Sequence, residues 1–312
     1  MITHLRRQTI DPEPTVAARL GPIVLGTDGS DDAQLAQRAA ADIARGAGVA
    51  VHVVGAWSTP VFDSPYGGYV LAEGIAEAAE AAVTAVVDRE SERVVHAGAH
   101  LAVRHTIFGR PGDAILRLAD EVAAGLIVIG SRGLGPLRRV VMGSVSEDVV
   151  HHSHRPVLVV RGGPEAWPPV RILVGDDGSA GARAAVVLAA AVGRALRVPV
   201  SVATVVPHIP PSIAEIPGMS IDAAISVARA RVEGRVAALS ESTGLDLTAW
   251  LGVGEPASTI LDESNAAPSP CLIAVGSRGL GAVERIRRGS VSTKILHGAH
   301  SSVLVVPPDE RA

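Results

Sequence analysis

Three kinds of side chain are scarce in this chain of 312 residues, and each scarcity narrows its chemistry. Cys271 is the only cysteine, which excludes an intramolecular disulfide and a zinc cluster held by cysteines. Lys294 is the only lysine, and it follows Thr293 rather than a glycine loop, so neither half of the chain has a Walker-type phosphate loop. Aromatic residues make up 2% of the sequence, so we do not expect a base to stack between aromatic rings.

Charge and hydrophobic runs exclude further classes of protein. The net charge of −4 provides no global basic field of the kind that nucleic-acid binding needs. The longest apolar run, Ala184 to Val192, is far shorter than the roughly 20 residues of a membrane-spanning helix. The N-terminal residues lack the apolar stretch of a signal peptide. We therefore expect a soluble, cytoplasmic protein that binds no nucleic acid and does not span a membrane.

One motif occurs twice with the same internal spacing. Residues 130–145 read Gly-Ser-Arg-Gly, nine further residues and then Gly-Ser-Val, and residues 276–291 repeat this pattern. Each copy follows a short aliphatic run and precedes a segment suited to a helix. Such a glycine loop lets backbone N–H groups approach a phosphate at the helix N-terminus. Tight turns would explain one isolated pair of glycines, but the matched repetition favours phosphate binding.

Aliphatic strands alternate with helical segments along the whole chain. In the first half we expect strands at residues 23–27, 51–54, 101–108, 126–129 and 156–160. The same order restarts at residue 172 after a linker of Gly and Pro residues. This alternation predicts parallel sheets covered on both faces by helices. We expect a polar leader at residues 1–20, a first α/β domain at 21–162, a linker at 163–170 and a second domain at 171–308.

A carboxylate follows the first strand of each half. Asp28 and Asp177 both precede Gly-Ser, and ligands of open parallel sheets bind beyond the carboxyl ends of strands. Either carboxylate can accept a hydrogen bond from an adenine amino group or a ribose hydroxyl, or help to hold Mg²⁺. Either can instead cap the following helix, a role for which Ser30 and Ser179 compete.

The serine that ends each glycine motif has two interpretations. Ser144 and Glu147 have the spacing of a helix capping box, whereas Ser290 is followed by Thr293 and is freer to contact a phosphate. The basic residues near the second copy are more numerous. The second copy has Arg285, Arg287, Arg288 and Lys294. The first copy has Arg138 and Arg139, and the carboxylates of Glu147 and Asp148 offset their charge. This difference predicts tighter anion binding in the second half.

The histidines at residues 151–154 end a helix, where they would stabilise its C-terminal dipole. We interpret them in that way rather than as metal ligands, because no carboxylate or cysteine is placed to complete a site. Cys271 precedes a buried strand and is expected to be a small core residue.

Taken together, these motifs resemble the universal stress proteins of the ATP-binding branch, in the tandem form of actinobacteria. The resemblance is carried by the glycine motif, by the Asp-Gly-Ser end of the first strand and by the closing Val-Leu-Val-Val strand, and it covers nearly all of residues 21–307. It implies two tandem Rossmann-like (adenine nucleotide α-hydrolase-like) domains. Each would have a five-stranded parallel sheet of order 3-2-1-4-5 with helices on both faces.

The resemblance also implies one ATP in each half, with Mg²⁺ as a further candidate ligand at Asp28 and Asp177. The Asp and a residue of the second strand would hold the adenine or ribose, and the glycine motif would hold the ribose and phosphates. The implied ATP-binding residues are Asp28, Val53, Gly130, Gly133, Gly143, Ser144 and Val145 in the first half, and Asp177, Val202, Gly276, Gly279, Gly289, Ser290 and Val291 in the second. No other metal site and no catalytic residue is assigned.

The role implied by the resemblance is regulatory, in responses to stress, hypoxia or dormancy. ATP would change the conformation of the protein or its choice of an unidentified protein partner. The halves would pack on each other through their last strands, Val157–Val160 and Val303–Val306, and a homodimer is a further expectation.

Two enzymatic alternatives stay open. A slow ATPase or autokinase would use the same sites, but hydrolysis needs a group that orients water and usually a metal clamp. We see no second carboxylate for this in either loop. A different Rossmann-like nucleotide enzyme, such as a nucleotidyl transferase or an electron-transfer flavoprotein, is the third possibility. The chain lacks the SGGxDS and HxGH motifs, which weighs against the transferases. We therefore expect at most weak ATP hydrolysis.

Overall fold

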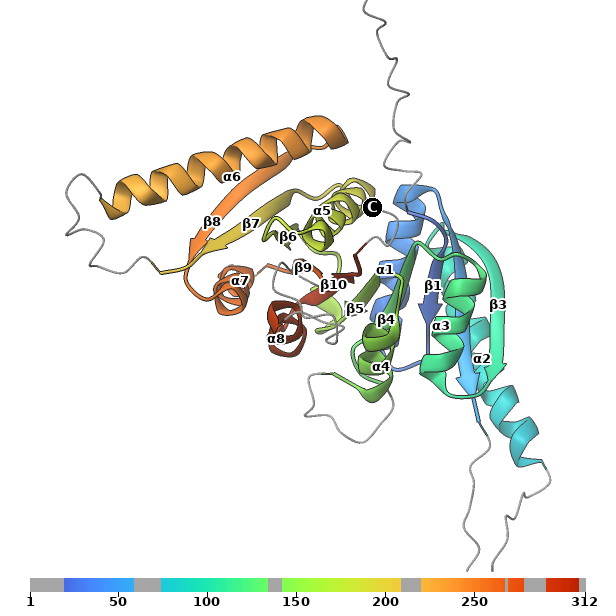
Figure 1. Ribbon diagram of the computed structural model, residues 1–312. Helices are drawn as coiled ribbons and strands as arrows, with labels where there is room; N and C mark the ends of the chain where they lie inside the picture. Colours follow the sequence, from blue (N-terminus) through green and yellow to red (C-terminus); the bar gives the residue numbers. More distant parts are fainter. Residues whose placement is uncertain are drawn as a thin grey trace, which may run out of the picture.

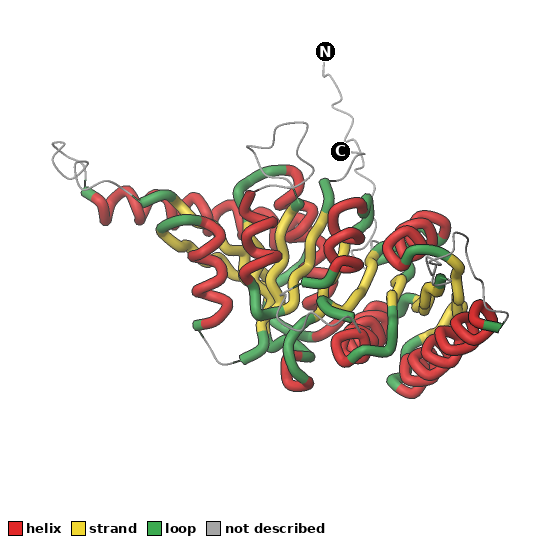
Figure 2. Tube along the Cα trace, turned by 90° about the horizontal axis from the view of Figure 1, so that it is seen from below, coloured by secondary structure: helices red, strands yellow, loops and turns green. Residues whose placement is uncertain are grey.

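The computed structural model describes residues 20–58, 74–133, 142–208, 220–266, 269–277 and 290–308. Their strands form one ten-stranded sheet, and helices pack on both of its faces (Figures 1 and 2). The fold is α/β, as the alternation of strands and helices predicted.

The first half contributes five parallel strands in the order β3-β2-β1-β4-β5, which confirms the expected order. Helices cover both faces of the sheet, so side chains on both sides of its central strands are buried. These strands are accordingly rich in Val, Ile and Leu. Its elements are β1 (Ile23–Gly26), α1 (Asp31–Ala47), β2 (Ala50–Trp57), α2 (Ile75–His96), β3 (His100–Phe108), α3 (Pro111–Glu121), β4 (Leu126–Gly130), α4 (Ser144–His152) and β5 (Val157–Val160).

The second half repeats this order as β8-β7-β6-β9-β10. A short 3-10 helix, η2 (Pro164–Ala166), lies between the halves. The elements are β6 (Arg171–Gly175), α5 (Ala180–Leu196), β7 (Val200–Val206), α6 (Ile221–Thr243), β8 (Leu247–Val253), α7 (Pro256–Asn265), β9 (Cys271–Gly276), α8 (Ser290–Gly298) and β10 (Ser302–Val306).

The two halves join through their last strands. β5 and β10 pair antiparallel, with Leu158 opposite Leu304, as the resemblance implied (Figure 1). Five strands from each half therefore form one sheet rather than two separate sheets. Because the joint is antiparallel, the strands of the two halves run in opposite directions. Their carboxyl ends therefore point to opposite sides of the molecule. Ligand sites at the carboxyl ends of the two sets of strands would therefore lie far apart in the fold.

Helices α1 and α5 also pack against each other across the joint. A Cβ atom at Gly46 of α1 would collide with the backbone of Ala195 in α5, so the two helices approach as closely as only glycine permits. Trp167, in the segment between the halves, is 5% exposed and donates a 3.1 Å hydrogen bond to Asp42 of α1. Both hydrophobic cores contain residues of both halves, so the joint is continuous with the interior.

Candidate functional site

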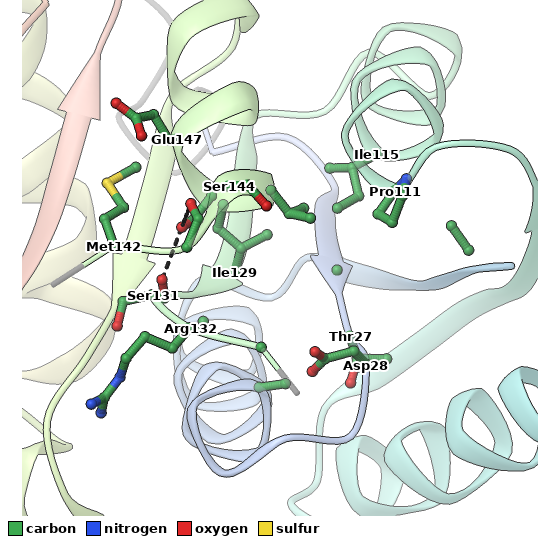
Figure 3. A pocket seen from close by; sticks show the side chains of 18 of the residues that line it. Thr27, Asp28, Pro111, Ile115, Ile129, Ser131, Arg132, Met142, Ser144 and Glu147 are labelled. Atoms are coloured by element: carbon green, nitrogen blue, oxygen red, sulfur yellow. Dashed lines mark hydrogen bonds between the residues drawn. The ribbon is translucent and has the colours of Figure 1, made fainter. Parts of the chain in front are cut away.

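A cavity of about 630 Å³ opens at the carboxyl ends of the first-half strands (Figure 3). This volume lies within the usual range of small-molecule sites. Figure 3 shows that Asp28, Ser144, Ile115 and Ile129 surround the same space, although they come from different elements. The lining is formed by Gly26, Thr27, Asp28, Ala33, Val54, Ala56, Pro111, Ile115, Ile129, Gly130, Ser131, Arg132, Gly133, Met142, Gly143, Ser144, Val145, Ser146 and Glu147.

Six of the seven first-half residues implied by the resemblance line this cavity, and Val53 does not. The Val53 side chain is fully buried in the core on the other face of the sheet. Val54 and Ala56 line the cavity instead, because successive side chains of a strand point to opposite faces. The Val53 side chain therefore faces away from the cavity, and a contact of this part of β2 with a ligand stays a prediction.

Gly130 and Gly133 are explained by packing within the fold. A Cβ atom at Gly130 would lie 2.7 Å from the carbonyl carbon of Asp32, so the end of β4 fits directly against the start of α1. A Cβ atom at Gly133 would collide with the carboxylate of Asp28. The same carboxylate accepts a 3.0 Å hydrogen bond from the Ser30 N–H, and this bond closes the turn after β1.

Gly143 has no comparable explanation. Its φ of −82° and ψ of 160° are open to any residue, and among the described residues the nearest neighbour of a Cβ atom there would be the Ser131 carbonyl oxygen, at 3.4 Å. That distance is an ordinary van der Waals contact. The described part of the fold therefore does not require a glycine at this position, which lies in the cavity wall immediately before α4.

The start of α4 faces the cavity without a side-chain cap. Gly143 is the N-cap residue, and Ser144 is the first residue of the helix, so the predicted capping box of Ser144 and Glu147 was wrong. Ser146 supplies the local brace, because its hydroxyl donates to the carbonyl oxygens of Ser131 and Gly143 at 2.9 Å each. Ser144 is exposed, and its hydroxyl makes no hydrogen bond to any residue in the described ranges. Uncapped N–H groups of this kind are suited to an anion.

Asp32 is a residue of the site that the sequence analysis missed. It is buried and accepts a 2.7 Å hydrogen bond from the Ser131 hydroxyl. It also accepts two hydrogen bonds from Arg132, at 3.0 and 3.2 Å, and these bonds raise the pKa of the guanidinium above its usual value. Arg132 is thereby directed away from Asp28 (Figure 3). An acidic residue in the first turn of a helix usually indicates only an interaction with the helix dipole. The sequence therefore did not indicate that Asp32 bonds to the glycine motif.

The cavity therefore has a polar side and an apolar side. The polar side consists of the glycine motif, the start of α4 and Asp28. The apolar side consists of Val54, Ala56, Pro111, Ile115, Ile129 and Met142. Chemically, this arrangement suits a ligand that carries an anionic group at one end and a flat, weakly polar group at the other.

The second half is described in part. Asp177 accepts a 2.9 Å hydrogen bond from the Ser179 N–H, as Asp28 does from Ser30, and Ser30 and Ser179 cap α1 and α5. The Val202 side chain is fully buried in the core, and Ala203 occupies the position equivalent to Val54. Gly276 packs against Gly181 as Gly130 packs against Asp32. Ser290 and Val291 begin α8, while Gly279, Gly289, Arg285, Arg287 and Arg288 lie outside the described residues.

Two ion pairs distinguish the second half. Asp176, which replaces Thr27, is buried and lies 2.8 Å from the Arg235 guanidinium. The lysine of α8, Lys294, lies 3.1 Å from Glu255 and is therefore engaged with a carboxylate. This contact removes Lys294 from the argument for tighter anion binding in the second half. That preference stays a prediction, because Arg138 and Arg139 also lie outside the described residues.

Two features are absent from the described residues. These residues contain no group of three or more His, Cys, Asp or Glu side chains arranged to hold a metal ion. No helix among them is both long and apolar enough to cross a membrane. Cys271 is 3% exposed, and burial raises the pKa of its thiol, as expected of a core residue.

Comparisons with known proteins show which family shares this sequence pattern and architecture. A sequence model of the universal stress protein family matches residues 20–161 and 170–307. A universal stress protein of Mycobacterium tuberculosis is 28% identical over 91% of this chain and 96% of its own length. One of Mycolicibacterium smegmatis is 31% identical over 60% of this chain and 63% of its own length. The crystal structure of a universal stress protein from Archaeoglobus fulgidus has a TM-score of 0.67 at 20% identity, covering 93% of this chain and 97% of that one. The chain belongs to the universal stress protein family.

Proposed function

We propose that this protein is an ATP-binding regulator of a stress, hypoxia or dormancy response, and that its first-half cavity is a nucleotide site. The observation that carries the proposal is Gly143. The described residues leave room for a side chain there, yet the residue is glycine at the uncapped start of α4, where a phosphate needs close access to the backbone. The same residue type recurs at Gly289 in the second half.

The cavity fits an adenine nucleotide in one direction. The phosphates would lie against Gly143, Ser144 and Val145, where N–H groups and the helix dipole favour negative charge. The base would lie against the apolar wall of Val54, Ala56 and Ile115, and Asp28 would accept a hydrogen bond from the ribose or the base. This wall serves instead of the aromatic stack that the composition excluded.

Mg²⁺ is a compatible companion of the nucleotide. Asp28 lies in the turn after β1, and its carboxylate lines the cavity. Protein-bound Mg²⁺ is usually held by one or two carboxylates together with substrate phosphates. When bound, the ion would neutralise part of the phosphate charge. Asp177 would have the same role in the second half.

The proposed role is binding rather than efficient catalysis. Hydrolysis would need a residue that orients water against the terminal phosphate. In the described lining only Asp28 and Glu147 carry carboxylates, and Asp28 already braces a turn. A slow ATPase remains the second candidate, with Glu147 as the residue to change first. An unidentified protein partner, whose choice depends on ATP, and a homodimer remain part of the proposal.

Calorimetric titration with ATP in excess Mg²⁺ tests the proposal, with ADP and cAMP titrated in parallel. We expect Gly143→Ala to fold with a loss of stability of no more than about 1 kcal/mol, the cost of alanine at an N-cap, and to bind MgATP at least about tenfold more weakly, as a lost phosphate contact implies. Gly163→Ala is the matched control, because a Cβ atom at Gly163 would meet nothing within 4 Å. Binding that is equally tight in both variants, or absent from the unaltered protein, contradicts the proposal.

A further inference from the structure

Arg161 is a buried arginine that crosses the joint between the two halves. It follows the last residue of β5, and it is 3% exposed. Its Nη1 donates hydrogen bonds of 2.9 Å to the carbonyl oxygens of Leu296 and Ala299. Its backbone N–H donates a 3.2 Å hydrogen bond to the Ser302 hydroxyl. All three partners belong to the second half, so a cation of the first half is held by groups of the second.

The guanidinium binds the carbonyl end of α8. The last carbonyl groups of a helix have no partner within the helix, and together they carry roughly half a negative charge. Leu296 lies in the last turn of α8, and Ala299 follows its last residue. The buried Nε and Nη2 atoms of Arg161 have no hydrogen-bond partner among the described residues. Within that part of the chain, the guanidinium is therefore bound directly by the carbonyl end of α8 and by no carboxylate.

The buried charge lies near the polar side of the first-half cavity. Val160, which precedes Arg161, accepts a 2.8 Å hydrogen bond from the N–H of Ser131 in the glycine motif. Burial lowers the pKa of the Arg161 guanidinium to about 10, while the nearby Asp32 carboxylate raises it and Arg132 lowers it. Asp32 and Arg132 belong to the network that fixes the glycine motif. Arg161 therefore stays charged at neutral pH, next to this network.

The antiparallel joint brings the end of α8 to the side of the first-half site. β10 begins just after α8, and its Val303 lies opposite Val159 near the end of β5. The carbonyl end of α8 therefore lies beside the carboxyl ends of the first-half strands, where the cavity opens. α4 and α8 pack on the same face of the sheet (Figure 1). The start of α4, which attracts an anion, and the end of α8, which repels one, thus lie on one side of the molecule.

We propose that Arg161 is a specificity-determining residue of the first-half site, whose buried charge favours phosphate-bearing ligands over neutral ones. This inference rests on the proposed nucleotide site. Without the guanidinium, the carbonyl end of α8 would oppose a phosphate at the start of α4. With it, that end is neutralised, and the remaining charge adds to the positive potential of the site. Pro307 occupies the equivalent position of the repeat in the second half, so the contribution is confined to the first.

Calorimetric titration with MgATP tests the inference through substitutions of Arg161. Arg161→Met and Arg161→Gln both remove the charge, and Gln keeps N–H donors for the carbonyl groups of α8. Both variants should bind MgATP about fivefold more weakly, the size expected for one charge at a partly screened site. Arg161→Lys keeps the charge and should stay within about twofold of the unaltered protein. If both halves bind MgATP, the affinity of one half alone should fall.

Adenosine separates an effect of charge from a loss of structure. Adenosine carries no phosphate, so its affinity, measured by displacement of MgATP, should change by less than about twofold in Arg161→Met. Arg171→Met is the matched control for the loss of a charge. Arg171 also binds the end of a helix, at the Glu263 carbonyl of α7, but β10 and β9 separate its strand, β6, from β5. This control should keep its MgATP affinity within about twofold.

The outcomes separate this inference from the proposed function. An equal loss of affinity for adenosine and MgATP assigns a structural role to Arg161 and overturns the inference. A loss in Arg161→Lys or Arg171→Met as large as that in Arg161→Gln overturns it as well, as does unchanged binding in Arg161→Gln. If Arg161→Met fails to fold, Arg161→Gln and Arg161→Lys decide between these outcomes, with circular dichroism to verify the fold. An absence of MgATP binding by the unaltered protein overturns the proposed function, and this inference with it.

Discussion

The Asp32 carboxylate accepts a 2.7 Å hydrogen bond from Ser131, a residue 99 positions away, and so ties the glycine motif to the first turn of α1. Asp32→Ala removes this bond and both bonds from Arg132. We expect the free energy of unfolding to fall by about 2 kcal/mol, because a buried, charge-assisted network is lost. MgATP affinity should fall as well. Urea denaturation and calorimetry measure the two effects, with Asp31→Ala, at the exposed neighbour in the same turn, as the control.

Glycine at the crossing of α1 and α5 is required by the joint between the halves. Gly46→Ala places a methyl group against the backbone of Ala195 and should destabilise the protein by about 1–3 kcal/mol, the usual cost of overpacking. Gly234→Ala is the matched change on α6, where the new methyl group would meet nothing within 4 Å. It should stabilise the protein by up to about 1 kcal/mol through helix propensity. Thermal unfolding that moves in the same direction for both variants would contradict this packing.

Acid should weaken the start of α7. The Glu255 carboxylate accepts a hydrogen bond from the Ser258 N–H and pairs with Lys294, and its pKa falls from 4.5 to about 2, with the backbone hydrogen bond as the largest cause. A lowered pKa means that the stabilisation is present above pH 4.5 and is lost as the pH falls toward 2. Glu255→Gln should cost about 1 kcal/mol at pH 7, the usual contribution of an N-cap, and nothing near pH 2.

Lys294→Met separates the cap from the ion pair of Glu255. It removes only an exposed salt bridge, so its effect on the free energy of unfolding should stay below about 0.5 kcal/mol. Denaturation at a series of pH values measures both variants. A loss for Lys294→Met as large as that for Glu255→Gln would show that the ion pair, rather than the cap, stabilises α7.

Two histidines on neighbouring strands should make the protein less stable below neutral pH. His52 Nδ1 and His105 Nε2 lie 3.2 Å apart on neighbouring strands, and burial lowers the pKa of both imidazoles. A lowered histidine pKa means that the unfolded chain binds protons more readily, so stability falls as the pH drops below 6.5. His52→Asn should reduce the slope of stability against pH between 7 and 5, whereas the exposed His96→Asn should not. Equal slopes in the two variants would assign the acid sensitivity elsewhere.

The repeat made much of the architecture predictable. Matched copies of the glycine motif, each between an aliphatic run and a helical segment, indicated two α/β units, and the resemblance supplied the strand order that the register confirms. The loop residues Gly130, Gly133, Gly143 and Ser144 meet at one cavity because they flank the end of β4 and the start of α4.

The remaining features of the site depend on geometry that spacing does not encode. Val53 and Val54 are both valines, and only the pleat of β2 decides which of them faces the cavity. The supposed capping box failed because Gly143, not Ser144, precedes the first helical residue. Asp32 went unnoticed because its partners lie about a hundred residues away in the chain.

The central claim is that the cavity beside Gly143 holds an adenine nucleotide. Mass spectrometry of the nucleotide released when the purified protein is denatured, quantified per chain, tests it most directly. We predict ATP at about one molecule per chain or more, since ATP that is bound tightly and hydrolysed slowly stays with the protein through purification. ADP alone would favour the slow ATPase. A protein that releases no nucleotide, and whose melting temperature does not change with ATP and Mg²⁺, would contradict the claim and leave the glycine motifs as elements of the fold alone.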